Sequence, residues 1–175
     1  MVGHFGSLNA MFAAILDDFS SLNGLGPARF AELQAILERA RRALSETLES
    51  GVTLAAPRAV RHYLELHFAT QAHESFVVLF LDTRNRLISA DDMFRGTLTH
   101  ASVYPREVVK AALRHNAAAV IVSHNHPSGV AEPSIADAAL TTSLKQALAL
   151  IEVRLLDHFI VGGGCLYSFA EQGRL

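Results

Sequence analysis

Apolar and polar residues follow a helical period in the first part of this chain. Between residues 7 and 19, and again from Pro27 to about Leu44, apolar side chains recur at helical spacing, which predicts two helices. The segment Leu22-Asn23-Gly24-Leu25-Gly26 lies between them and predicts a tight turn. The period fades over residues 45–56, which predicts a linker. A small helical unit, residues 1–44, is therefore expected ahead of the rest of the chain.

The period changes after this linker. A further helix is predicted from Pro57 to about Phe68, and continuous apolar runs at 76–81 and 117–123 predict strands buried on both faces. The remaining expected elements are strands at 86–90, 96–99, 153–161 (interrupted by Asp157-His158) and 165–169, a helix that opens at Pro105, and a helix from 134 to about 150. This alternation predicts an α/β (α+β) unit over residues 57–175, with helices flanking a sheet.

Composition narrows the class of protein. Of the 175 residues, 50% are hydrophobic and 18% are charged, which is typical of a folded globular chain. The net charge of −2 gives no support for a protein that holds nucleic acid mainly through its electrostatic field. No basic segment followed by an apolar run opens the chain, and no stretch of about 20 apolar residues is present. We therefore expect a soluble cytoplasmic protein without a membrane partner; its oligomeric state stays open.

Several polar residues have plain interpretations. The single cysteine, Cys165, excludes an internal disulfide and any site made of several thiolates, and its apolar neighbours predict a buried side chain. His115-Asn116 is expected to cap the C-terminal end of a helix. Asp157-His158 could orient part of a metal site, although a simple pair at a strand end is the favoured interpretation.

The segment between the strand at 117–123 and the next helix carries the candidate chemistry. His124 and His126 are separated by one residue, and in extended backbone such side chains share a face, so two imidazoles can converge on one ion. Asp137, one turn into the next helix, can supply a third ligand. Two imidazoles, one carboxylate and a water are typical of a catalytic zinc, although Fe²⁺ or Mn²⁺ could fit the same set. The spacing predicts one zinc per chain rather than a hydrogen-bonded surface turn.

Ser134 stands three residues before Asp137. Its hydroxyl can cap the helix, and it could also donate to an oxyanion that forms beside the metal. The two roles compete for one oxygen, though not necessarily for its proton. Zinc would lower the pKa of a bound water to roughly 7, and a base would still be needed to take and return the proton.

The spacing His-x-His, seven residues, Ser, two residues, Asp resembles the JAMM (MPN+) metalloprotease motif, and His124, His126, Ser134 and Asp137 match it. The segments VYPREVVKAALRHNAAAVIVSHNHPSG and LLDHFIVGGGCLYSFAEQG look like the bacterial RadC family over roughly residues 57–175. The resemblance implies a mixed sheet flanked by helices, as in the wider cytidine-deaminase-like group, and zinc-dependent cleavage of an amide or isopeptide bond. The compact spacing lacks the insertions with which eukaryotic deubiquitinating relatives hold ubiquitin, so ubiquitin is not the expected substrate.

The family pattern also places a glutamate at the start of an apolar strand well upstream, and Glu74 occupies that position here. The resemblance implies that Glu74 is the general base, acting on the water at the metal. From the residues alone Glu74 would be a solvated carboxylate at a strand end, because nothing in the spacing links it to His124.

The N-terminal helices and their turn resemble a helix-hairpin-helix unit. Such turns can present backbone N–H groups, here at Gly24 and Gly26, to DNA phosphate. Charges over residues 1–44 cancel, with Arg29, Arg39, Arg41 and Arg42 against Asp17, Asp18, Glu32 and Glu38. We therefore expect weak DNA binding at most, since phosphate neutralisation supplies much of the affinity; simple packing of two helices is the favoured alternative.

Three functional hypotheses follow. The first is a zinc metallohydrolase, a metallopeptidase or isopeptidase whose peptide substrate the sequence does not name. The second is a module associated with DNA repair or recombination that binds DNA or protein and whose metal site is not catalytic. The third is a metal-dependent nuclease that uses the same residues.

Overall fold

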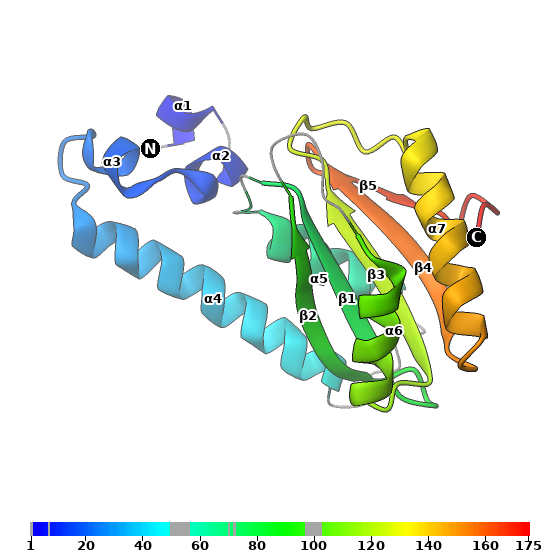
Figure 1. Ribbon diagram of the computed structural model, residues 1–175. Helices are drawn as coiled ribbons and strands as arrows, with labels where there is room; N and C mark the ends of the chain where they lie inside the picture. The colour runs from blue at the N-terminus through cyan, green and yellow to red at the C-terminus, as the bar shows by residue number, and fades with distance from the viewer. Residues whose placement is uncertain (1, 7, 50–56, 70, 72, 97–102) are drawn as a thin grey trace.

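The computed structural model describes residues 2–6, 8–49, 57–69, 71, 73–96 and 103–175 (Figure 1). Its strands are β1 (Ser75–Leu81), β2 (Leu87–Arg95), β3 (Ala119–Asn125), β4 (Arg154–Gly162) and β5 (Cys165–Ser168). Its helices are α1 (Val2–Phe5), α2 (Leu8–Ala13), α3 (Leu16–Ser20), α4 (Pro27–Glu49), α5 (Pro57–Phe68), α6 (Pro105–Arg114) and α7 (Ile135–Ala149).

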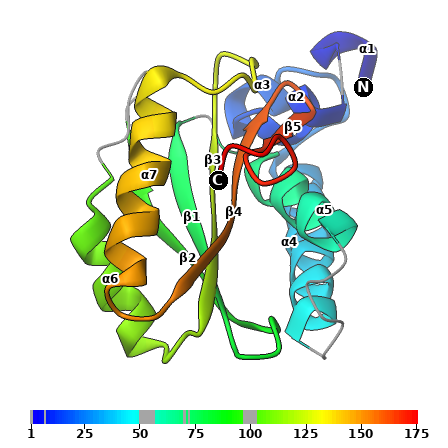
Figure 2. The same ribbon diagram turned by 90° about the vertical axis from the view of Figure 1, so that its right-hand side faces the viewer.

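The strands form one five-stranded mixed sheet in the order β2-β1-β3-β4-β5. Strands β3 and β4 run parallel, and the other neighbouring pairs run antiparallel. Helices α6 and α7 lie on one face of the sheet, and α4 and α5 lie on the other (Figure 2). The predicted α/β class, with helices flanking a mixed sheet, is confirmed.

Strand β1 lies at the centre of the hydrophobic core because both of its faces are covered. All of its residues are buried. The odd-numbered residues from Val77 to Leu81 pack with α5, and the even-numbered residues from Phe76 to Phe80 pack with α6 and α7. Each such side chain contributes about 1.5–3 kcal/mol to the free energy of folding. The continuous apolar run predicted this two-sided burial.

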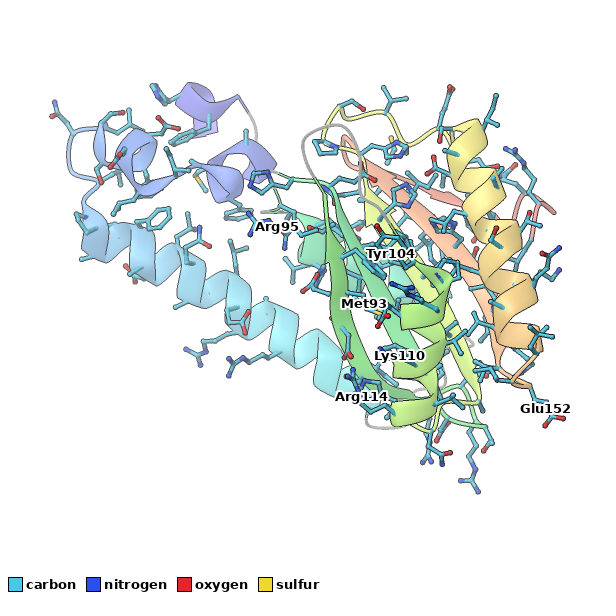
Figure 3. All side chains as sticks on the ribbon, viewed as in Figure 1. Met93, Arg95, Tyr104, Lys110, Arg114 and Glu152 are labelled. Carbon is cyan, nitrogen blue, oxygen red and sulfur yellow. The ribbon has the colours of Figure 1, made fainter. Side chains whose placement is uncertain are left out.

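Asp91 of β2 ties the C-terminal end of α6 to the sheet. Its carboxylate accepts a hydrogen bond from Arg114 at 3.1 Å and lies 2.8 Å from Nε2 of His115. Arg114 lies at the end of α6, beside β2 (Figure 3). Burial alone would raise the pKa of Asp91, but hydrogen bonds from Ser89 and His115 hold it below its usual range. His115 is the C-cap of α6, and Asn116 follows with a left-handed φ of 51°. The predicted helix end is therefore confirmed.

The N-terminal helices differ from the prediction. The expected single helix over residues 7–19 is divided into α2 and α3, because Ile15 has extended backbone (φ −80°, ψ 163°) that interrupts the helical hydrogen bonds. Met11 and Phe19 on either side of the break are both buried, so the apolar spacing alone could not reveal it. Helix α4 continues to Glu49 instead of ending near Leu44, which makes residues 45–49 of the expected linker helical. Residues 50–56 lie outside the described residues.

Two strand predictions also need correction. Strand β3 extends to Asn125, so His124 lies in the sheet and not in the loop that follows it. Strand β4 runs through Asp157-His158 without the expected interruption. The buried Asp157 carboxylate is satisfied there by the backbone N–H groups of His158 and Ala170 and by the Ser168 hydroxyl. Of the short strand expected at 96–99, Gly96 is not in a strand and the rest lies outside the described residues.

Cys165 is exposed, so the prediction that it would be buried is wrong. It is the first residue of the edge strand β5, directly after the Gly163-Gly164 turn, where its side chain faces away from the core. In the part of the chain that the structure describes, no helix has the length and apolarity needed to cross a membrane.

Candidate metal centre

The end of β3 and the first turn of α7 bring three ligand side chains together. The Nε2 atoms of His124 and His126 lie 3.0 Å apart, and carboxylate oxygens of Asp137 lie 3.2 Å from the first and 3.6 Å from the second. Ligand atoms placed tetrahedrally at about 2.0–2.1 Å from a zinc ion would be separated by about 3.3 Å. The three side chains can therefore hold one metal ion.

The electrostatics of this cluster favour a cation. Burial alone would raise the pKa of Asp137, but its contacts with the imidazoles of His124 and His126 and with the Ser134 hydroxyl hold it far below its usual range. The contact with Asp137 raises the pKa of His126 despite partial burial, and the charge of Glu74 acts in the same direction. This contact favours a proton on the imidazole beside the ionised carboxylate. A metal ion can take the place of that proton, and its binding would release the proton.

The loop after β3 orients His126. Its Nδ1 atom donates to the carbonyl oxygen of Val130 at 2.7 Å, because a carbonyl oxygen can only accept. Its backbone N–H donates to the carbonyl oxygen of Val161 in β4 at 2.8 Å. In the neutral ring the lone pair is therefore on Nε2, the atom that faces His124 and Asp137.

Ser134 is the N-cap of α7 and forms a capping box with Asp137. Its Oγ accepts from the backbone N–H of Asp137 at 3.1 Å. The carboxylate of Asp137 accepts from the backbone N–H of Ser134 at 2.7 Å and from its hydroxyl at 2.6 Å. The box holds Asp137 in the first turn of the helix, beside the histidines. The exposed Ser134 hydroxyl uses both its lone pair and its proton within the box.

The structure also brings Glu74 to the centre. Glu74 directly precedes β1, which pairs with β3. The buried side chain of Asn125 accepts from the backbone N–H of Ser75 at 2.8 Å and donates to the carbonyl oxygen of His73 at 3.0 Å. These two bonds hold the backbone on both sides of Glu74 to the end of β3, and the Glu74 carboxylate is close enough to raise the pKa of His126.

A groove of about 940 Å³ opens beside His126. Phe12 of α2 and Leu66 and Phe68 of α5 give it an apolar wall, and Asn125 and His126 line it on the side of the metal centre. The described residues that line it include Glu65 and two histidines, and they include no lysine or arginine. The groove is therefore suited to an uncharged or weakly charged chain.

Comparison with known proteins places this arrangement in a family. Residues 54–174 match the family model described as a RadC-like JAB domain. The chain belongs to the RadC family. A UPF0758 protein of Herminiimonas arsenicoxydans is 66% identical over 100% of this chain and 78% of its own length. Similar proteins of Janthinobacterium sp. (strain Marseille) and Nitrosomonas eutropha are 64% and 60% identical, over 100% and 99% of this chain and 78% and 77% of their own lengths. The predicted family membership is confirmed.

Two further residues of this RadC-family site were missed or misread in the sequence. Nε2 of His158 lies 2.9 Å from Nδ1 of His124, so its interpretation as part of a simple strand-end pair is wrong. Oγ1 of Thr141 lies 2.7 Å from Nδ1 of His158. Thr141 follows Asp137 by four residues, which places both on one face of α7, and this spacing was an available signal. The parallel pairing of β3 with β4, which brings His158 to His124, has no counterpart in local sequence.

The candidate DNA-contacting glycines lie elsewhere. Gly24 and Gly26 are in the turn between α3 and α4, away from the loop that follows β3 (Figure 1). Gly24 has a left-handed φ of 82°, and among the described residues no atom beyond the chain neighbours lies within 4 Å of the position that a Cβ would take at either glycine. The turn therefore has free space around both glycines, and DNA contact there stays a prediction.

Proposed function

We propose that this RadC-family protein is a zinc-dependent metallohydrolase that cleaves amide or isopeptide bonds. The observation that carries the proposal is the convergence of His124, His126 and Asp137 at ligand distances, with the charge of Glu74 near enough to raise the pKa of His126. Zinc, when bound by these three residues, would supply Lewis acidity and make a water acidic near neutral pH.

Two side chains of the protein carry out proton transfer and oxyanion stabilisation. Glu74 takes a proton from the attacking water and returns it to the leaving amine, as a general base and then a general acid. The Ser134 hydroxyl, exposed beside Asp137, can turn its proton from the carboxylate to an oxyanion that develops next to it. Its Oγ can still cap α7 while it does so, because the lone pair and the proton are separate.

The groove beside His126 supports a peptide as the substrate. Its apolar wall suits a peptide chain with apolar or small side chains. A nucleic-acid substrate would bring a row of phosphate charges, and the described lining offers Glu65 but no lysine or arginine to neutralise them. We therefore favour the peptidase over the nuclease.

Zinc content is the test of this function. Purified wild-type protein should hold about one zinc per chain after zinc is supplied, while His126→Ala and Asp137→Ala should lose it, because each removes one of three protein ligands. Glu74→Gln should retain zinc, since Glu74 is not a ligand. Elemental analysis of the four proteins side by side measures this. A wild-type protein that takes up no zinc would contradict the proposal.

A second candidate function, weak DNA binding through the N-terminal hairpin, rests on the free space around the Cβ positions of Gly24 and Gly26. We expect binding to short duplex DNA only at low salt, since a few phosphate contacts weaken steeply as salt rises. Fluorescence anisotropy of labelled DNA would measure it. Changing both glycines to alanine should abolish the signal, and binding that survives this change would show that the hairpin is not the contact.

A further inference from the structure

His158 is a fully buried histidine whose ring is fixed on every side. Phe169 stacks on it with ring centroids 4.9 Å apart, and Phe76 meets it edge-on at 6.0 Å. Its two ring nitrogens contact His124 and Thr141, at 2.9 Å and 2.7 Å. Because the ring is fully buried and its two nitrogens contact an imidazole and a hydroxyl rather than a carboxylate, the ring is neutral and carries one proton.

The direction of each hydrogen bond follows from the last acceptor in this series. The Thr141 hydroxyl lies 2.7 Å from the backbone carbonyl oxygen of Asp137, which can only accept, so Thr141 donates to it. The hydroxyl oxygen must then accept from Nδ1–H of His158. With its proton on Nδ1, His158 has a lone pair on Nε2 and accepts from Nδ1–H of His124. The lone pair of His124 is consequently on Nε2, the atom that faces His126 and Asp137.

We propose that Thr141 and His158 form a one-directional hydrogen-bond relay that sets the tautomer of His124 required of a metal ligand. The inference rests on the proposed function, because it concerns the same metal centre. Both are positioning residues: they touch neither metal nor substrate, and they act through His124. The relay starts on one ligand and ends on the backbone of another, so it also links β3 to α7 around the site.

The opposite direction would disable the ligand. If the Thr141 hydroxyl donated to Nδ1 of His158, then Nε2–H of His158 would donate to His124, and the proton of His124 would be on Nε2, where the metal binds. The carbonyl oxygen of Asp137 would lose its hydrogen bond from Thr141 at the same time. The Thr141 hydroxyl has one proton. Because it donates that proton to the carbonyl oxygen of Asp137 and not to His158, His124 takes the tautomer that can bind a metal.

Thr141→Val tests the relay because it keeps the shape of the side chain and removes its hydroxyl. Thr142→Val is the matched control. Thr142, the next residue in α7, is exposed and makes the same kind of bond to the carbonyl four residues earlier, at 3.0 Å, and it forms no hydrogen bond with a histidine of the described residues. Thr141→Ser should restore the relay. We expect zinc affinity, measured by competition with a chelating indicator, to fall about 10- to 100-fold in Thr141→Val and to stay near the wild-type value in the other two.

A second measurement does not use metal. Long-range ¹⁵N–¹H NMR of the histidine rings, on zinc-free protein at alkaline pH, reports which nitrogen of His124 carries the proton. The proton should be on Nδ1 in wild type and Thr142→Val, and move at least partly to Nε2 in Thr141→Val. An unchanged His124 tautomer in Thr141→Val, or zinc affinity equal to that of Thr142→Val, would overturn the relay. If the wild type binds no zinc, the proposed function fails, and the NMR measurement still decides the relay.

Discussion

Glu74→Gln should keep about one zinc per chain and cleave a peptide substrate about 10³-fold more slowly than the wild type. Glutamine has nearly the same shape, so the hydrogen bonds of Asn125 to the backbone on both sides of residue 74 remain. The amide cannot take a proton from water at neutral pH, which removes the general base without disturbing the ligands. This variant is therefore expected to retain its zinc and to lose turnover.

The measurement uses a library of quenched fluorescent peptides with zinc-loaded protein. Glu152→Gln is the matched control, because Glu152 is exposed beyond the C-terminal end of α7, is not among the residues that line the groove, and undergoes a chemically identical substitution. This control should stay within a few-fold of wild-type turnover. Full turnover by Glu74→Gln would remove Glu74 as the base, and no cleavage of any peptide by the wild type would count against a peptidase.

Gly163→Ala should destabilise the protein by about 3 kcal/mol, from strain and overpacking together. A Cβ at residue 163 would lie 2.5 Å from the carbonyl oxygen of Gly129, a backbone atom in the loop that carries His126. The residue also has a left-handed φ of 57°, which favours glycine. The turn between β4 and β5 would have to move away from the metal loop, so zinc affinity should fall with stability.

Gly164→Ala separates the two causes. Gly164 also has a left-handed φ, 80°, but nothing lies within 4 Å of its Cβ position. It should therefore cost only the backbone strain, about 1 kcal/mol. Urea unfolding of the zinc-free proteins gives both values. Equal destabilisation by the two substitutions would show that the close approach of the Cβ to Gly129 does not contribute to the effect.

Local sequence was sufficient for the parts of the protein that depend on short-range periodicity. The buried strands β1 and β3 and helices α5, α6 and α7 were predicted near their observed bounds, because apolar runs and helix-start residues act within a few positions. The spacing of His124, His126 and Asp137 predicted a ligand group for the same reason: strand and helix geometry fix which side chains share a face. The break at Ile15 was not predicted, since both helices around it bury the same apolar stripe.

Contacts between distant segments were decided only by the tertiary structure. Glu74 comes near His126 because β1 pairs with β3, and no spacing within the chain links these two segments. Its role as the general base, which the resemblance to a family implied, stays a prediction. His158 reaches His124 because β4 lies parallel to β3, and Thr141 completes the contact from α7. Local patterns determine what each segment becomes, whereas strand order and pairing determine which side chains meet. A relay through three elements can therefore be recognised only once the sheet is assembled.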